Sequence, residues 1–261
     1  MRGTIVRPVV CVAVLLMAVL VEAQTTDRPA CTQATLNGAY GLMHDGVVFG
    51  PEGHLAEIGI ARFDGMGGWS LDAVLVSQGS GLRRVNNRDG RYTVNPDCTG
   101  SSTLRGAEPF TFEFIVFDNG KAMTQLATRT DRAVTWELRK QAASACSRET
   151  LSGRYAILQA GFDPEGNARS GAGIATFDGK GGWSLVVTEV KKDNPIQHIT
   201  NPNGTYSVNS DCRGSASLAN TPFGAANWEF VIVDGGREVF QIVTTPPRGT
   251  ILWTLRKQFA P

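Results

Sequence analysis

The residues of this chain that could do chemistry occur mostly as matched pairs. Glu113 lies between two phenylalanines, and Glu229 lies between a tryptophan and a phenylalanine. A carboxyl group inside an apolar cavity has a raised pKa and can orient a ligand or act as a general base. Because both faces of each surrounding strand are apolar, the pattern leaves open whether these glutamates point inward or outward to pair with Arg or Lys.

The tyrosines and four of the five tryptophans are paired in the same way. Such aromatic side chains either fill a protein core or line a ligand cavity. The candidate ligand-binding residues are Tyr40, Trp69, Tyr92, Glu113, Trp136, Tyr155, Trp183, Tyr206, Glu229 and Trp253. We assign no catalytic residue.

Histidine and serine patterns argue against several other kinds of chemistry. His44, His54 and His198 have no counterparts in the other half of the chain, so we expect them on the surface. The sequence lacks His-x-x-x-His and Cys-x-x-Cys spacings, so neither a metal nor another cofactor is expected. It also lacks the Gly-x-Ser-x-Gly elbow of serine hydrolases.

The matched residues reflect an internal repeat. Phe63–Leu71 (FDGMGGWSL) recurs at Phe177–Leu185 with a single difference, Met66 against Lys180. Further matched stretches follow at a nearly constant spacing along the chain. The protein therefore consists of two homologous units, 31–141 and 146–258, joined by a short connection.

Each unit has the pattern of short strands rather than helices. Runs of β-branched and aromatic residues are separated by Gly, Asn, Asp and Pro. Short connections favour antiparallel neighbours, and closure into a barrel removes exposed sheet edges. The predicted fold is all-β, with two tandem eight-stranded antiparallel up-and-down barrels. The strands expected in the first unit are 37–44, 56–63, 69–77, 91–95, 99–104, 110–117, 121–128 and 132–140.

The repeated FDGMGGW stretch is interpreted as a hairpin turn. Its glycines can adopt the positive φ that a tight turn requires. A phosphate-binding loop would need a helix after the glycines. The residues from Trp69 onward read as a strand instead.

The cysteines test this topology. Four remain after residue 23, and repeat symmetry leaves either Cys31–Cys98 with Cys146–Cys212 or a pairing between the units. In the predicted meander, the start of the first strand and the turn after the fourth lie at the same end, which we call the floor. Bonds within each unit, one disulfide per barrel, are therefore expected, and a pairing between the units is the less favoured alternative.

The opposite end of each barrel, the rim, is expected to carry the longer and more divergent segments. Binding residues usually lie on such loops above a rigid scaffold. The predicted rim segments are 45–55, 78–89 and 105–109 in the first unit, and 160–169, 191–203 and 219–224 in the second.

Residues 1–23 are typical of a secretory signal peptide. Arg2 and Arg7 precede the apolar run Pro8–Leu20, and cleavage is expected after Ala23. The full chain has 25 Lys and Arg against 24 Asp and Glu. Removing the segment takes away Arg2, Arg7 and Glu22, so the numbers of basic and acidic residues become equal. A neutral, secreted or periplasmic protein is expected, with no nucleic-acid partner and no integral membrane association. The oligomeric state is not predicted.

The motif Leu-x-Gly-x-Tyr, at Leu36–Tyr40 and Leu151–Tyr155, resembles the Gly-x-Trp opening of the calycin barrels, which include lipocalins and avidins. The segments Trp136–Arg139 and Trp253–Arg256 are similar to the last calycin strand, whose arginine closes over the first-strand aromatic residue. The resemblance implies an apolar small ligand inside the barrel. The repeated Asp-Cys and FDGxGGW stretches also resemble tandem secreted bacterial barrels of unknown function.

Three functional hypotheses follow from these observations. The first is a non-catalytic protein that binds small apolar or amphipathic ligands inside its barrels. The second is a barrel isomerase or cyclase of the allene oxide cyclase or dirigent type, with Glu113 or Glu229 paired to a tyrosine. The third is an envelope or structural protein with filled cores and an apolar outer patch on each unit.

Overall fold

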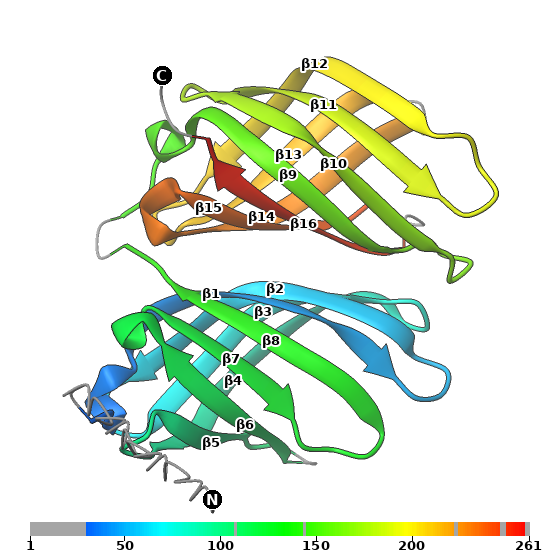
Figure 1. Ribbon diagram of the computed structural model, residues 1–261. Helices are drawn as coiled ribbons and strands as arrows, with labels where there is room; N and C mark the ends of the chain where they lie inside the picture. The colour runs from blue at the N-terminus through cyan, green and yellow to red at the C-terminus, as the bar shows by residue number, and fades with distance from the viewer. Residues whose placement is uncertain (1–29, 107–108, 143–144, 222–223, 246–248, 259–261) are drawn as a thin grey trace, which may run out of the picture.

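The computed structural model describes residues 30–106, 109–142, 145–221, 224–245 and 249–258. Over these ranges the chain forms two closed, eight-stranded antiparallel β-barrels, which lie beside one another in Figure 1. The predicted fold class is confirmed. The predicted signal peptide, 1–23, lies outside the described residues.

Barrel 1 is a meander in which each strand pairs with its neighbours in sequence, and pairing of β1 with β8 closes the ring. The 3-10 helix η1 (Gln33–Thr35) precedes β1, and η2 (Asp118–Gly120) joins β6 to β7. The strands are β1 (Asn37–Val48), β2 (Gly53–Asp64), β3 (Gly68–Ser77), β4 (Gly81–Val94), β5 (Thr99–Leu104), β6 (Phe110–Phe117), β7 (Ala122–Ala127) and β8 (Arg132–Lys140).

Barrel 2 repeats this order, and β9 pairs with β16 to close it. Its short helices are η3 (Arg148–Thr150) and η4 (Asp234–Gly236). The strands are β9 (Ser152–Phe162), β10 (Ala168–Asp178), β11 (Gly182–Lys191), β12 (Gln197–Val208), β13 (Arg213–Thr221), β14 (Gly224–Val233), β15 (Glu238–Val243) and β16 (Thr250–Lys257). Among the described residues, none of the helices has the length and hydrophobicity needed to cross a bilayer.

The strands extend further toward the rim than the sequence predicts. We expected a loop over 78–89, but β4 begins at Gly81. Charged residues such as Arg83 occupy its rim half and obscure the alternation that identifies a strand. The pairing of β3 with β4 also shifts register between Trp69 and Leu71, which breaks the pattern further.

An aspartate organises the repeated FDGMGGW turn. The Asp64 carboxylate accepts hydrogen bonds from the backbone N–H groups of Met66 (2.7 Å) and Gly68 (2.9 Å), and these bonds lower the pKa of Asp64. Gly65 has a φ of 75°, a conformation that favours glycine. Asp178 makes the same contacts in barrel 2, so the motif is a hairpin turn in both copies, as predicted.

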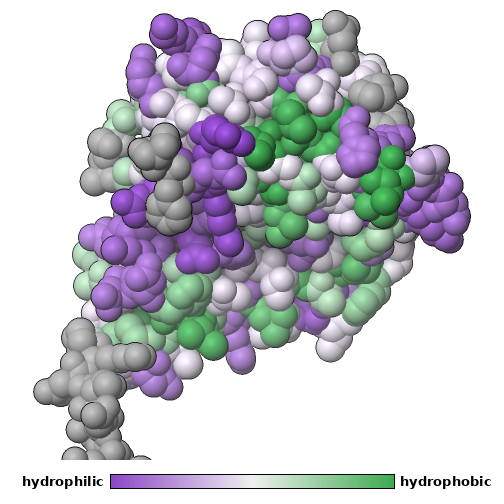
Figure 2. Space-filling model, turned by 45° about the horizontal axis from the view of Figure 1, so that its top comes forward, coloured by the Kyte–Doolittle hydropathy of each residue, from purple (hydrophilic) through white to green (hydrophobic). Residues whose placement is uncertain are grey.

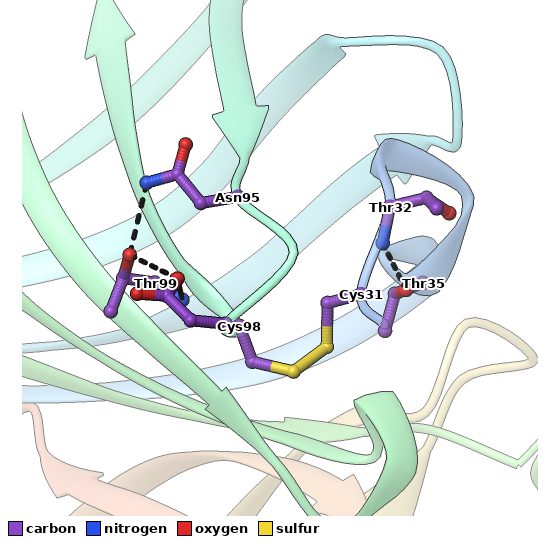
Figure 3. Close-up of a disulfide and its surroundings, with 7 residues drawn as sticks. Cys31, Thr32, Thr35, Asn95, Cys98 and Thr99 are labelled. Carbon is purple, nitrogen blue, oxygen red and sulfur yellow. Dashed lines mark hydrogen bonds between the residues drawn. A yellow bond between two sulfur atoms is a disulfide. The ribbon is translucent and has the colours of Figure 1, made fainter. Parts of the chain in front are cut away.

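A disulfide closes the floor of each barrel. Cys31 bonds to Cys98, and Cys146 bonds to Cys212, with Cα atoms 5.0 Å and 4.9 Å apart. Figure 3 shows how the first bond ties the segment before β1 to the turn between β4 and β5. Pairing within each unit is confirmed. Disulfides are typical of oxidising compartments outside the cytoplasm.

Aromatic side chains fill the interior next to the floor. In barrel 1 the Phe63 and Trp69 rings stack with centroids 5.6 Å apart, and Tyr40 meets the face of this pair edge-on. Phe177 and Trp183 repeat the stack in barrel 2 at 5.7 Å. Each barrel therefore has its own buried aromatic core.

The barrels pack against each other through outward-facing apolar residues. One surface, the first-strand face, lies on β1–β3 of barrel 1, and the other, the last-strand face, lies on β14–β16 of barrel 2. Figure 1 shows these strands facing one another. The central residues are Met43, Ala56, Ile58, Ile60 and Val76 on the first-strand face, and Val231, Val233, Phe240, Ile242 and Leu252 on the last-strand face.

Close approach and paired charges complete this contact. Gly41 lies against Val233, and a Cβ at position 41 would collide with that side chain. At the edge of the contact, Arg84 pairs with Glu229 at 2.6 Å. The interface thus has an apolar centre and a polar border, as stable protein contacts usually do.

We expect the double substitution Cys31→Ser with Cys98→Ser to destabilise barrel 1 by about 4 kcal/mol, because the bond closes a long loop in the unfolded chain. The two cysteines are 67 residues apart. Urea unfolding monitored by circular dichroism measures the change. The matched substitution of Cys146 and Cys212 should have a similar effect on barrel 2. Non-reducing peptide mapping that linked Cys31 to Cys146 would contradict the assignment.

Candidate functional site

A row of buried side chains crosses the interior of barrel 1. The strand register places Glu57 opposite His44, His44 opposite Trp136, and Trp136 opposite Gln125. The four residues come from β2, β1, β8 and β7, which are consecutive around the ring. None is more than 4% exposed. We call these four residues the polar row of barrel 1.

His44 and Glu57 form a buried pair at one end of the row. His44 Nδ1 lies 2.9 Å from Glu57 Oε2. A carboxylate at this position favours the tautomer in which Nδ1 carries the proton and donates it to the carboxylate. The second ring nitrogen, Nε2, then presents a lone pair to the interior. The imidazole lies beside the Trp136 indole, with ring centroids 5.6 Å apart.

Three buried polar atoms of this row have no hydrogen-bond partner among the described residues. They are His44 Nε2, Trp136 Nε1 and Gln125 Nε2. Ser102 donates to Gln125 Oε1 at 3.3 Å, so the NH₂ group is the free end of that amide. Each buried unpaired polar group costs about 1–3 kcal/mol. Two N–H donors and one imidazole nitrogen form a set that suits a ligand with a hydroxyl or carbonyl group.

Barrel 2 has a corresponding row with a different distribution of charge. Register places Gln159 opposite Trp253, and Trp253 opposite Gln241. Gly171 and Glu189 continue the row on β10 and β11. We call these five residues the polar row of barrel 2.

The buried glutamate lies on the second strand of barrel 1 and on the third strand of barrel 2. Barrel 1 places Glu57 on its second strand beside Leu75 on the third, whereas barrel 2 has Gly171 and Glu189 at those places. A Cβ at Gly171 would lie 3.3 Å from Gln159 Oε1. The absence of a side chain there lets Glu189 reach across to the residue that corresponds to His44.

The Glu189 carboxylate is paired with side chains of barrel 2. Gln159 donates to Glu189 Oε1, and Arg169 pairs with the same oxygen at 2.5 Å. A cavity of about 40 Å³ adjoins these three side chains. That space holds a few water molecules at most, far below the volume of a pocket for a drug-sized ligand.

The four predicted tyrosines hydrogen-bond to backbone carbonyl groups. The Tyr40 hydroxyl donates to Gly120 O at 2.5 Å, and the Tyr155 hydroxyl donates to Gly236 O at 2.7 Å. The hydroxyls of Tyr92 and Tyr206 lie 2.9 Å from the carbonyl oxygens of Leu36 and Leu151. All four hydroxyls are engaged by backbone at the floor, away from the polar rows.

The predicted tryptophans fall into two groups. Trp69 Nε1 donates to Arg91 O, and Trp183 Nε1 donates to Ser217 O, each at 3.2 Å. These two indoles are held by backbone. Trp136 and Trp253 instead belong to the polar rows, and their N–H groups lack partners among the described residues.

The predicted glutamates lie outside the barrels. Glu113 is exposed on β6, and Glu229 faces outward from β14, where Arg84 pairs with it. Neither carboxylate lines an interior. The calycin-like arginine also points outward: Arg139 pairs with Glu137 at 2.7 Å. Lys140 lies over the Tyr40 ring instead, with Nζ 5.8 Å from its centroid.

Trp136 and Trp253 are the members of the polar rows that the sequence pointed to, and the other members were not predicted. The expectation that His44 is on the surface was wrong, because it is 4% exposed. The signal was present in strand alternation: Tyr40 and His44 have the same parity, as do Phe63 and Glu57. In the described part of the chain, no cluster of His, Cys, Asp and Glu could hold a metal ion.

Comparison with known proteins gives structural likeness at low similarity. No family model and no curated protein matches the chain. A solved structure of kievitone hydratase from Nectria haematococca aligns over 90% of this chain and 95% of its own, with 7% identity and a TM-score of 0.29. A protein of unknown function from the DUF3598 family of Nostoc punctiforme aligns over 86% and 97%, with 9% identity and a TM-score of 0.25. Likeness at this level carries no argument.

We expect the native tyrosines to resist ionisation. Burial raises the pKa of Tyr40 and Tyr155 to about 12, whereas an unfolded tyrosine titrates near about 10. Folding favours the neutral phenol, so this stabilisation is complete below pH about 10 and is lost as the pH rises toward 12. Ultraviolet absorbance of tyrosinate, followed with circular dichroism, measures both. Full ionisation of the native protein near pH 10 would contradict the assignment.

Proposed function

We propose that barrel 1 binds a small, uncharged molecule with a hydroxyl or carbonyl group on an apolar body. The observation that carries this proposal is the set of three buried polar atoms without partners in one row. His44 Nε2 accepts a hydrogen bond from a ligand hydroxyl, while Trp136 and Gln125 donate to a ligand oxygen. An uncharged ligand is favoured, because the Glu57 carboxylate adjoins the row and disfavours a second negative charge.

The aromatic core limits the size of this ligand. Phe112 packs against Trp136 with ring centroids 4.6 Å apart, and Trp69 lies on the floor side of both. The ligand therefore enters from the rim and stops at the polar row. Leu55 and Val134, both buried at the rim side of the row, supply its apolar contacts.

The wider assignment is an extracytoplasmic binding protein. The predicted signal peptide and the two disulfides support secretion or a periplasmic location. An apolar-bodied ligand inside a barrel is also what the calycin resemblance implies. The divergence of the two rows supports a division in which barrel 1 binds and barrel 2 is structural.

We expect Gln125→Met to weaken binding about tenfold, because it removes one hydrogen-bond donor worth about 1.4 kcal/mol while keeping side-chain volume. Paired probes that differ by one hydroxyl, such as cyclohexanol and cyclohexane, are titrated against tryptophan fluorescence. The hydroxylated probe should bind more tightly to the wild type, and the difference should shrink in the variant.

The matched control for this experiment is Gln241→Met, which makes the same change in barrel 2. Its binding should equal that of the wild type. Equal effects of the two variants, or equal binding of the two probes by the wild type, would exclude the polar row of barrel 1 as the site.

Acid–base catalysis is a second candidate, favoured by the geometry of His44. Its Nδ1 is oriented by Glu57, and its free Nε2 can take a proton from a bound substrate. The isomerase predicted from Glu113 or Glu229 needs those carboxylates inside a cavity, and both face outward. His44 with Glu57 replaces them as the acid–base pair in this alternative.

We expect His44→Gln to separate binding from catalysis. Glutamine stands at the corresponding position 159, so the barrel accommodates it. A pure binding protein retains most of its affinity, because the amide still offers hydrogen bonds. An isomerase loses turnover by at least about a hundredfold. Proton exchange into a bound hydroxy-ketone, followed by NMR, measures the second outcome.

A further inference from the structure

The contact between the barrels uses one face of each copy and leaves the equivalent faces uncovered. Barrel 1 docks through its first-strand face on β1–β3, and barrel 2 docks through its last-strand face on β14–β16. The repeat places β9–β11 of barrel 2 where β1–β3 stand in barrel 1, and β6–β8 where β14–β16 stand. We call these two surfaces the free first-strand face and the free last-strand face.

The free faces carry most of the exposed large apolar side chains of the described residues. Six such side chains on them are between 40% and 65% exposed. On the free first-strand face they are Leu158, Val186 and Val190, and on the free last-strand face they are Ile115, Phe117 and Leu126. In Figure 2, hydrophobic residues gather in green areas on the side formed by barrel 2.

Five of the six exposed residues stand at positions that are apolar in the buried interface, whereas Val186 stands at the place of Asp72. Leu158 stands at the place of Met43, because each follows the tyrosine of its first strand by three residues. Each also pairs with the equivalent residue of the next strand. Ile115 and Phe117 stand at the places of Val231 and Val233, which are buried between the barrels. Single exposed apolar residues are ordinary, but matched patches on both unused faces are not.

The polar border of the contact is also partly reproduced. Glu113 stands at the place of Glu229, and His198 stands at the place of Arg84, opposite Thr188 on β11. An imidazole and a carboxylate can form a hydrogen bond where the internal contact has an ion pair. Ala156 replaces Gly41, so the free faces approach less closely than the internal pair. A contact between two free faces would therefore bury less surface than the internal one.

We propose that a second copy of this chain docks on these faces. The free last-strand face of one molecule packs against the free first-strand face of the next, which repeats the contact within the chain. Such a contact is heterologous: each molecule offers two different surfaces, so association continues into an open chain or closes into a ring. The faces lie on the sides of the barrels and leave the rim of barrel 1 open.

The test compares three lysine variants of the purified, disulfide-bonded protein. Leu126→Lys places a charge on the free last-strand face, and Leu158→Lys places one on the free first-strand face. Met66→Lys is the control, because Met66 is 79% exposed in a floor turn and its counterpart is Lys180. Sedimentation velocity over a wide concentration range measures association, and circular dichroism verifies folding.

We expect the wild type and Met66→Lys to grow beyond dimers as concentration rises. Leu126→Lys and Leu158→Lys should each weaken self-association at least about tenfold, because a desolvated charge replaces an apolar contact. An equimolar mixture of these two variants should form dimers and nothing larger. Each mixed pair retains one intact face of each kind.

Three results would overturn the proposal. The first is a wild type that stays monomeric up to its solubility limit, which would assign the faces to another partner. The second is undiminished association of Leu126→Lys alone, which would indicate a symmetric contact or another surface. The third is loss of association in Met66→Lys, which would indicate unspecific hydrophobic aggregation.

Discussion

Closure of each sheet into a ring is the constraint on which the other features of this protein depend. Every strand in a ring has two partners, so the sheet has no free edge. Along each strand, successive side chains alternate between the barrel interior and the surface. Residues an even number of positions apart on one strand therefore lie on the same side of the barrel wall. His44 lies inside because Tyr40 does, and Glu57 lies inside because Phe63 does. The same alternation turns the outer side of β2 into an apolar strip that a second barrel can cover.

The floor and the rim half of each barrel obey different requirements. At the floor, a disulfide, an aspartate-capped turn and backbone-bound tyrosines recur in both copies. Nearer the rim, one exchange between the copies involves two positions together. Glu189 can occupy the row of barrel 2 because Gly171 vacates the space that Glu57 fills in barrel 1. The exchange moves the carboxylate to another strand of a close-packed interior.

The sequence predicted the fold and the hairpin turns from local patterns, and it predicted the disulfides because the resulting meander brings each cysteine pair to one end of its barrel. It did not predict the polar rows, because we searched for residues that match between the copies, and His44 with Glu57 is a mismatch. The orientation of Glu113 and Glu229 stayed open for a physical reason. Their strands are apolar on both sides, since the outer side of β14 is an interface. Contacts between barrels cannot be read from alternation within one strand.

Each barrel has two different apolar faces, of which one is covered by the other barrel and one is exposed. This difference in burial accounts for the differences between the outer surfaces of the copies. The docked last-strand face has Phe240 where the free one has Thr124, and the docked first-strand face has Ile58 where the free one has Ala172. A permanently covered face gains from each added apolar group, whereas an exposed face must also remain soluble. Because the rims lie at the ends of the barrels, these outer faces can change without altering the polar row of barrel 1. The proposed ligand recognition and the proposed assembly therefore use separate surfaces of one closed sheet.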